Sequence, residues 1–320
     1  MAKLKMGVIG SGHMGRYHIN VLSSLHCVDL KAICDIDEQT ASEIAAKYNI
    51  PSYTDLDEFL KHVDAVVVAT PTITHYEIAK KVLQAGKHVL VEKPLTDSVQ
   101  SAEDLISYAD KNKLILQVGH LERFNGAVAE LRNNIIQNPY LIEARRLSPQ
   151  NPRIKDVGVV LDIMIHDIDI VVSLVPGQKV KNVSACGSRI YTNQEDVAAA
   201  IIEFDGGCIA DIKSSRVTAE KIRTLAVSQE SSYVFLDYTT QDIQIHRQPS
   251  SAYMVNQIEI KYSQESLIER VFIHKDNPLK LELVHFVDCI LNGAEPHVKG
   301  EMDLLTLELA MRIHHQINGK

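Results

Sequence analysis

The sequence lacks the features that mark several classes of protein. None of its apolar runs approaches the roughly 20 residues that a membrane-spanning helix needs, so we expect no membrane insertion. Its five cysteines are scattered, odd in number and without a C-x-x-C pair, which argues against a disulfide framework or a zinc site. We therefore expect no metal, and reduced thiols in the core at Cys27, Cys34, Cys186, Cys208 and Cys289.

Positive charge is also in short supply. The chain has 33 lysines and arginines against 41 acidic residues, and its net charge of −8 would repel a nucleic acid. It contains no internal repeat and no low-complexity segment. An apolar strand starts at Leu4 and leaves no room for a signal peptide, so we expect a cytoplasmic protein.

The sequence does contain enough apolar residues for two domains. Of its 320 residues, 45% are hydrophobic and 23% are charged, as in a globular protein. The pattern of strands and helices changes near residue 120. We therefore predict one domain over residues 1–120 and a second over residues 121–320.

Strand and helix signals alternate through the first 120 residues, which predicts βαβ units and a parallel sheet. The predicted strands are 4–9, 28–34, 65–69, 88–92 and 115–119. The predicted helices between them are 16–24, 38–48, 55–60, 75–85 and 98–111. Right-handed crossovers would bring the carboxyl ends of these strands to one rim, where ligands bind.

Strand signals crowd together in the second part, and a glycine turn at 205–207 predicts a hairpin. The predicted strands are 141–146, 180–188, 197–204, 208–213, 225–228, 233–237 and 242–246. The predicted helices are 125–134, 159–174, 279–291 and 302–317. We expect an antiparallel sheet flanked by helices, and an α/β protein as a whole.

The strongest chemical signal is the segment Gly10-Ser11-Gly12-His13-Met14-Gly15, which directly follows the first strand. Gly10 permits a tight turn, Gly12 lets the backbone approach a pyrophosphate, and Gly15 lets the helix pack on the strand. The helix N-terminus offers N–H groups and a positive dipole end to phosphates. This context predicts a dinucleotide site to which His13 and Met14 also contribute.

Asp35 ends the second strand, 20 residues after Gly15. A carboxylate there can accept a hydrogen bond from a ribose 2′-hydroxyl, and it repels a 2′-phosphate. No lysine or arginine follows at 36–39, so we predict NAD rather than NADP as the cofactor. The alternative is that Asp35 only caps the next helix.

Two segments are candidates for proton transfer. Lys93 lies in Glu92-Lys93-Pro94 at the end of a predicted strand, where a lysine beside a cofactor can exchange a proton with a substrate. Asp162, His166 and Asp169 are spaced to share one face of an apolar helix, so Asp162 could orient the imidazole. The alternatives are a solvated lysine and a satisfied buried His–Asp pair.

Several characteristic segments occur in order along nearly the whole chain: Gly10/Gly12/Gly15, Ala69-Thr70-Pro71-Thr72 with His75, Gly86-Lys87-His88, Glu92-Lys93-Pro94 and Asp162-x-x-x-His166. In these segments the chain resembles the glucose–fructose oxidoreductase/inositol dehydrogenase (Gfo/Idh/MocA) family. The resemblance implies a Rossmann domain of doubly wound parallel sheet, followed by an α+β domain with an open, mostly antiparallel sheet. It also implies a homodimer or homotetramer.

The family resemblance implies roles for particular residues. Lys93, Asp162 and His166 would line the substrate hydroxyl opposite the nicotinamide. Glu92 would lie near the nicotinamide ribose, and the loop of Thr70, Pro71 and His75 along the dinucleotide. Whether Lys93 or His166 is the immediate base stays open.

Residues 119–125, 145–149, 152–153 and 159–169 resemble the UDP-N-acetylglucosamine 3-dehydrogenase branch of this family. Those enzymes oxidise the sugar 3-hydroxyl to a ketone. A partner aminotransferase then makes the amine, and the 2,3-diamino sugar enters lipid A synthesis.

A sugar nucleotide needs a grip on its diphosphate, and arginine forks suit phosphate oxygens. We expect positive charge ahead of the catalytic helix from Arg145, Arg146, Arg153 and Lys155, with a solvated charged loop as the alternative. Arg123 and Asn125 follow a predicted strand, where they could meet substrate or nicotinamide.

Two other functions stay open. One is the same hydride chemistry on inositol or a free sugar, which would need no diphosphate grip. The other is a non-catalytic NAD-binding sensor. A sensor would need the glycine turn but not the proton-transfer residues.

Overall fold

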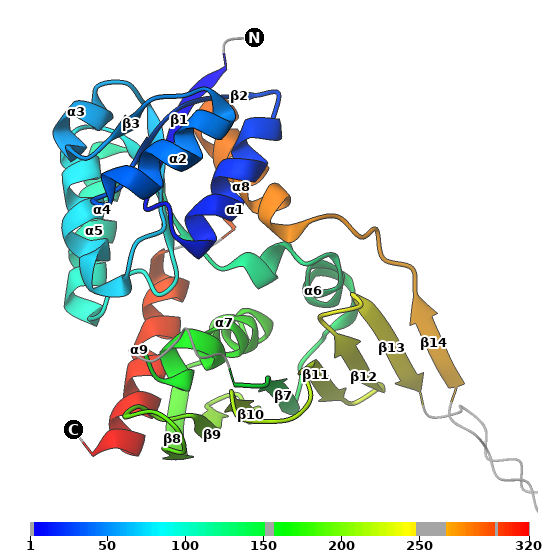
Figure 1. Cartoon of the computed structure of the whole chain (residues 1–320). Helices are drawn as coiled ribbons and strands as arrows, with labels where there is room; N and C mark the ends of the chain where they lie inside the picture. The colour runs from blue at the N-terminus through cyan, green and yellow to red at the C-terminus, as the bar shows by residue number, and fades with distance from the viewer. Residues whose placement is uncertain (1–2, 151–156, 248–266, 298–299, 320) are drawn as a thin grey trace, which may run out of the picture. The chain divides into compact units, whose positions relative to one another are not determined.

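The chain forms two compact units, and each is described by itself. The computed structural model describes residues 3–150, 157–247, 267–297 and 300–319 (Figure 1). The first unit comprises Met1–Phe124 and Asp276–Met311, and the second comprises Asn125–Lys275 and Arg312–Lys320. Helix α9 (Gly300–Asn318) contributes its first part to one unit and its last part to the other.

The first unit is built on a six-stranded parallel sheet with the order β3-β2-β1-β4-β5-β6. Its strands are β1 (Leu4–Ile9), β2 (Val28–Cys34), β3 (Ser52–Tyr53), β4 (Ala65–Val68), β5 (His88–Glu92) and β6 (Leu116–Gly119). The strand order reverses between β1 and β4. In open sheets of this kind, that reversal marks the crevice where ligands bind.

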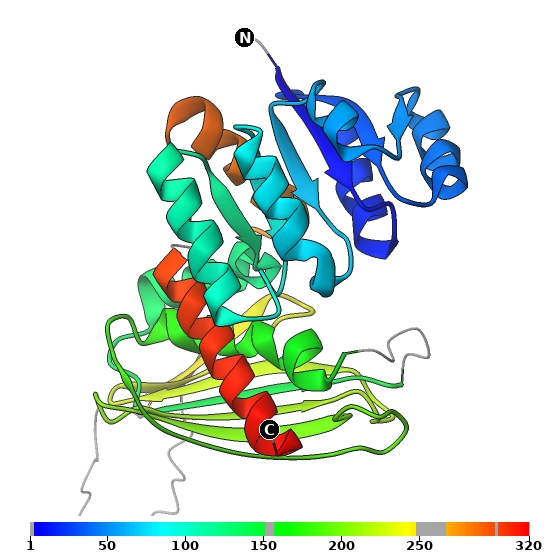
Figure 2. The ribbon, with the colours of Figure 1, turned by 90° about the vertical axis from the view of Figure 1, so that its left-hand side faces the viewer.

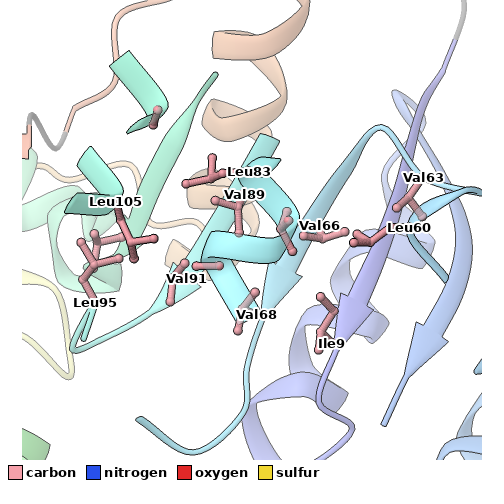
Figure 3. Packing of buried hydrophobic residues seen from close by; sticks show 14 of the residues in the cluster. Ile9, Leu60, Val63, Val66, Val68, Leu83, Val89, Val91, Leu95 and Leu105 are labelled. Carbon is pink, nitrogen blue, oxygen red and sulfur yellow. The ribbon is translucent and has the colours of Figure 1, made fainter. Parts of the chain in front are cut away.

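Helices cover both faces of this sheet. They are α1 (His13–Ser24), α2 (Glu38–Tyr48), α3 (Leu56–Leu60), α4 (His75–Gln84), α5 (Val99–Asn112) and α8 (Pro278–Asn292), with short helical turns η1 (Thr72–Thr74) and η2 (Leu121–Phe124). One core lies between the sheet and α3, α4 and α5, where Val66, Val89 and Leu105 pack together (Figure 3). The other lies between the sheet and α1, α2 and α8. Strands covered on both faces are apolar throughout, as Ala65–Val68 is.

The second unit is built on an eight-stranded sheet with the order β14-β13-β12-β11-β7-β10-β9-β8. Its strands are β7 (Leu141–Leu147), β8 (Val180–Ser188), β9 (Val197–Phe204), β10 (Ile209–Ser215), β11 (Ile222–Gln229), β12 (Ser232–Asp237), β13 (Asp242–Arg247) and β14 (Leu267–Val271). The pairing of β7 with β10 is parallel, and the other pairings are antiparallel. Helix α7 (Ile165–Leu174) lies over one face (Figure 2).

The structure confirms the predicted fold class, a parallel Rossmann sheet followed by a mostly antiparallel one. It also confirms the hairpin at 205–207, which joins β9 to β10. Two strands were not predicted: β3, which has two residues, and β14, which pairs with β13 at the edge of the described sheet. β3 is too short, and β14 is too exposed, to leave a clear apolar pattern in the sequence.

Two predicted helices are less regular than expected. The helix predicted at 125–134 consists of α6 (Gly126–Glu130) and a π-helical turn, η3 (Leu131–Ile135). The helix predicted at 159–174 starts with another π-helical turn, η4 (Val160–Met164), before α7. Hydrophobic periodicity locates a helix but does not distinguish one wide turn within it.

The prediction that all five cysteines are core residues is wrong for Cys186, which is exposed on β8. Cys34, Cys208 and Cys289 are buried, and burial raises the pKa of each thiol to about 11. Among the described residues, no helix is both long and apolar enough to cross a bilayer.

Helix α8 lies far along the chain but belongs to the first unit. Asn277 caps it by accepting a hydrogen bond from the Leu279 N–H, and Pro278 occupies its first turn. Phe286 and Leu283 lie on its buried face and pack in the core shared with α1. The same face carries Glu282, which is fully buried. Neither oxygen of Glu282 has a hydrogen-bond partner among the described residues.

We expect Phe286→Ala to lower the free energy of unfolding by about 3–5 kcal/mol, because it deletes a buried ring and leaves a cavity. The exposed Leu291 on the same helix is the matched control, and Leu291→Ala should cost less than about 1 kcal/mol. Urea denaturation of the full chain measures both. Equal losses would contradict the assignment of α8 to this core.

Glu282→Gln should remove a pH dependence of stability. Burial, together with the charge of Glu92, raises the pKa of Glu282 well above its ordinary value. The folded chain therefore keeps a proton that the unfolded chain releases. Stability should thus be greatest below the ordinary pKa of a glutamate and fall as the pH rises through the raised pKa.

We therefore expect the Glu282→Gln variant to be more stable than the wild type at mildly alkaline pH and to converge with it in acid. Urea denaturation across this pH range measures the difference. The exposed Glu308→Gln is the control. A wild-type loss of stability that persists in Glu282→Gln would show that a different group titrates.

Candidate active site

The glycine loop between β1 and α1 has the geometry that its sequence predicts. Gly10 has a φ of +92°, and a Cβ there would lie 2.6 Å from the Ala69 carbonyl oxygen. A Cβ on Gly15 would overlap the Gly10 carbonyl oxygen, so the helix can approach the strand only without one. A Cβ on Gly12 would meet nothing within 4 Å. Gly12 therefore leaves open space over the loop rather than relieving an internal clash.

Asp35 is tied to this loop. Its Oδ2 accepts hydrogen bonds from both the backbone N–H and the hydroxyl of Ser11, each at 2.6 Å. Its Oδ1 accepts one from the Asp37 N–H at 3.0 Å. Burial alone would raise the pKa of Asp35, but these hydrogen bonds outweigh burial and lower it. The residue that caps α2 is Asp37, so the alternative reading of Asp35 as the cap is wrong.

Several observations fit this rim to a dinucleotide. No side chain in the described part of the chain caps the N-terminus of α1, which leaves its N–H groups to phosphates. Gly12, His13 and Pro71 are exposed, and Met14 and Thr70 are half-buried. Ile36 after β2 is 96% exposed, and Ile73 after β4 is 78% exposed. Exposed apolar side chains of this size suit the flat face of an adenine ring.

Glu92 and Lys93 lie at the carboxyl end of β5. The Glu92 side chain is buried, and its Oε1 accepts a hydrogen bond from His18 Nε2 at 2.7 Å. Burial would raise the pKa of Glu92, but His18 and Lys93 together lower it, so the carboxylate is charged. Lys93 is half-buried, and its peptide bond to Pro94 is cis.

His75 begins α4 and is 1% exposed. Its Nδ1 lies 2.9 Å from the Pro94 carbonyl oxygen, and its Nε2 lies 2.9 Å from the Thr70 carbonyl oxygen. The structure thus brings the predicted residues Thr70 and His75 together with the turn that follows Lys93. The described contacts of His75 are with the backbone behind the rim.

Asp162 and His166 lie in the second unit, and both are half-buried. Asp162 is in the π-helical turn η4, and His166 is in the first turn of α7. The wide turn closes where the Ile165 N–H donates to the Val160 carbonyl oxygen. Turns of this kind occur often at functional sites. The third residue of the predicted stripe, Asp169, is buried.

A buried ion pair fixes the start of α7. Asp167, next to His166, accepts hydrogen bonds from the Arg146 side chain of β7 at 2.8–3.1 Å, and both side chains are at most 3% exposed. The Arg146 guanidinium also lies over the Tyr238 ring, 4.8 Å from its centroid. A two-point ion pair of this kind fixes both the orientation and the position of the Asp167 side chain relative to β7.

This ion pair corrects the predicted basic loop. Arg146 is occupied by Asp167 and is turned into the unit, so it is not available to a diphosphate. Arg145 is exposed on the opposite face of β7, because successive side chains of a strand alternate. Arg153 and Lys155 lie outside the described residues.

Three charged residues that the sequence did not indicate hold the start of η4. Glu195 is buried, its carboxylate accepts from the Val160 N–H at 3.3 Å, and its carbonyl accepts from the Val159 N–H. Arg216 donates to the Val157 carbonyl oxygen at 2.7 Å and pairs with Asp196. Glu195 and Arg216 lie 35 or more positions from the backbone groups that they contact, and all three residues flank strands, so no local pattern indicates them.

The Asp196 carboxylate is unusually well satisfied. It accepts hydrogen bonds from the N–H groups of Ile190, Tyr191 and Thr192 and from Arg216. Burial alone would raise the pKa of Asp196, but these donors hold it well below its ordinary value. The carboxylate therefore stays charged and keeps Arg216 in place.

Arg123 and Asn125, predicted to meet substrate or nicotinamide, are both 2% exposed. Arg123 donates to the His297 carbonyl oxygen within the first unit. Asn125 caps α6 in the second unit and donates to the Tyr238 carbonyl oxygen. These contacts hold the backbone, and the substrate role of both residues stays a prediction.

Comparison with known proteins matches both halves of the chain to one family. Residues 4–120 match the Gfo/Idh/MocA oxidoreductase family with its NAD-binding Rossmann fold, and residues 126–233 match the Gfo/Idh/MocA C-terminal domain. The chain is 34% identical to UDP-N-acetylglucosamine 3-dehydrogenase of Acidithiobacillus ferrooxidans over 77% of this chain and 78% of that one. It is 28% identical to scyllo-inositol 2-dehydrogenase (NAD⁺) of Bacillus subtilis over 97% and 92%.

A solved structure of UDP-N-acetylglucosamine 3-dehydrogenase GnnA from Acidithiobacillus ferrooxidans has the same fold. It superposes with a TM-score of 0.90 at 29% identity and covers 100% of this chain and 99% of that one. The glycine loop, the strand order and the two matched domains lead to one conclusion. The chain belongs to the Gfo/Idh/MocA family of NAD-binding oxidoreductases.

Proposed function

We propose that this protein oxidises the 3-hydroxyl of UDP-N-acetylglucosamine to a ketone with NAD⁺. The observation that carries the proposal is the extent of its likeness to UDP-N-acetylglucosamine 3-dehydrogenase. That likeness includes the second unit, where substrate selectivity is expected, as well as the shared Rossmann domain. The half-buried Lys93, Asp162 and His166 support a catalytic role, because such groups are accessible and yet held in place.

The proposed roles of the residues follow from their chemistry. When bound, NAD⁺ supplies the acceptor for the hydride of sugar C3. The α1 N-terminus and Gly12 hold the phosphates, and Asp35 accepts from the adenosine ribose. Lys93, with His166, takes the proton of the 3-hydroxyl, and Asp162 orients the imidazole.

An inositol dehydrogenase is the second candidate. The positions of Arg145 and Arg146 support this candidate. Arg146 pairs with Asp167 and Arg145 is exposed on the opposite face of β7, so neither is placed to bind a diphosphate beside α7. The likeness to an inositol dehydrogenase also extends over nearly the whole chain. Neutral polyols need no charged grip.

Two partners belong to the proposal. A 3-keto sugar nucleotide is the substrate that an aminotransferase converts to an amine, so such an enzyme is the functional partner, ahead of lipid A synthesis. The protein itself is proposed to be a homodimer or homotetramer. Exposed Ile201, Ile209 and Tyr233 on strands of the second unit give that sheet apolar surface.

The test of function is NADH formation from NAD⁺, followed by near-ultraviolet absorbance at mildly alkaline pH. UDP-N-acetylglucosamine, UDP-glucose and myo-inositol are compared side by side. A signal confined to UDP-N-acetylglucosamine supports the proposal, and a signal confined to myo-inositol supports the second candidate. NAD binding without turnover of any of the three would contradict both.

We expect Lys93→Ala to lower kcat by about 10²- to 10⁴-fold, the usual contribution of a general base, while NAD⁺ still binds. The exposed lysine Lys111 on α5 is the matched control, and Lys111→Ala should leave kcat unchanged. Steady-state kinetics and NAD⁺ titration separate the two effects. Unchanged turnover in Lys93→Ala would remove Lys93 from the mechanism.

Asp35→Ala should weaken NAD⁺ binding and lower the ratio of kcat/KM for NAD⁺ to that for NADP⁺, because the carboxylate no longer repels a 2′-phosphate. The substitution also removes the partner of Ser11. Ser11→Ala is therefore the control, since it removes one donor and keeps the carboxylate. An equal change of the ratio in both variants would assign the effect to loop structure instead of ribose recognition.

A further inference from the structure

Two buried histidines of the first unit lie behind the residues that flank Lys93. His18 is fully buried in α1, and it donates from Nε2 to the carboxylate of Glu92, the residue before Lys93. His75 is 1% exposed at the start of α4, and its Nδ1 lies 2.9 Å from the carbonyl oxygen of Pro94, the residue after Lys93. The side chain before Lys93 and the backbone after it are thus each held by a buried histidine.

Each histidine also belongs to a segment of the dinucleotide site. His18 is in the helix whose uncapped N-terminus follows the glycine loop, one turn past Gly15. His75 reaches the Thr70 carbonyl oxygen with its second ring nitrogen, also at 2.9 Å. Thr70 follows β4 and starts the loop expected along the dinucleotide. His18 therefore joins helix α1 to Glu92, and His75 joins the loop that starts at Thr70 to Pro94.

These two histidine contacts can fix the position of Lys93 relative to the dinucleotide-binding segments. A hydrogen bond to a charged carboxylate in a buried setting is short and strong. Burial would raise the pKa of Glu92, but His18 and Lys93 lower it, so the carboxylate is charged. A Cβ on Gly119, the β6 partner of Glu92, would come within 3.2 Å of Glu92 Oε2, so the carboxylate packs against Gly119 in space that a larger side chain would fill. The His75 ring in turn lies between two carbonyl oxygens of different loops.

We propose that His18 and His75 are positioning residues that couple the two dinucleotide-binding segments to Lys93. The proposal rests on the proposed role of Lys93 as a base. It assigns to the histidines no contact with substrate or cofactor. His18 holds the Glu92 carboxylate and His75 holds the Pro94 carbonyl oxygen, so their loss displaces the Lys93 amine from the reacting hydroxyl.

The expected result is a loss of kcat that exceeds the loss of NAD⁺ affinity. A displacement of about 1 Å in a reacting group can cost about 10²-fold in rate. We expect His75→Phe and His18→Leu to lower kcat about 10- to 100-fold, with the Kd for NAD⁺ changed by less than about 5-fold. His75→Gln and His18→Gln retain an N–H donor and should recover part of the rate. The exposed His26→Gln is the control and should match the wild type.

A double-mutant cycle separates positioning from a merely structural role. If the histidines act through Lys93, His75→Phe or His18→Leu should cost nothing further once Lys93→Ala is present. A purely structural role would lower the residual rate of Lys93→Ala by the same factor as in the wild type, which would overturn the proposal. The assay uses NAD⁺ with whichever of UDP-N-acetylglucosamine and myo-inositol the wild type oxidises.

A second measurement needs no turnover. Hydrogen exchange followed by mass spectrometry should show faster exchange of the segment 92–97 in His75→Phe and in His18→Leu. Exchange of β4 in these variants, and of segment 92–97 in His26→Gln, should remain as in the wild type. Unchanged exchange of segment 92–97 in His75→Phe and His18→Leu overturns the coupling. Lys93→Ala alone tests the proposed function, so a failure there is distinguishable from a failure of the coupling.

Discussion

Burial of a parallel sheet on both faces is the constraint from which the rest of the first unit follows. Such a sheet needs helices on each side, and every crossover returns the chain to the same end. The segments after β1, β2, β4 and β5 therefore share one edge, and they carry Gly10, Asp35, Thr70 and Lys93. The same need for cover explains why α8 joins this unit from far along the chain, since its apolar face closes the core over α1.

The buried charges beside the candidate residues are each neutralised in a different way. Asp167 has a two-point partner in Arg146, and Asp196 has three backbone donors and Arg216. Glu282 has no described partner and keeps a proton instead. Removal of one member of a buried pair leaves the other charge uncompensated, which is far costlier than loss of a surface pair. Such pairs hold the helix of Asp162 and His166 in place.

Residues of one motif can serve different purposes. Within Glu92-Lys93-Pro94, the carboxylate turns inward to His18 and the Pro94 carbonyl faces His75, while Lys93 between them is half-buried. His75 belongs to a segment expected along the dinucleotide, yet both of its ring nitrogens contact backbone oxygens. The motif thus contains residues that hold a candidate reactive group in place as well as the candidate reactive group itself.

The fold class, most strand and helix positions, the glycine loop and the family could be predicted from the sequence, because they depend on local periodicity and on turn chemistry at fixed spacing. The position of Asp35 at its strand end could be predicted in the same way. The partner that each polar side chain takes depends instead on the tertiary structure. Glu195 supports η4 from 35 residues away, Arg146 pairs with Asp167, and His18 reaches Glu92 across 74 positions. Those choices depend on how strands and helices pack in space, and no local pattern in the sequence records that packing.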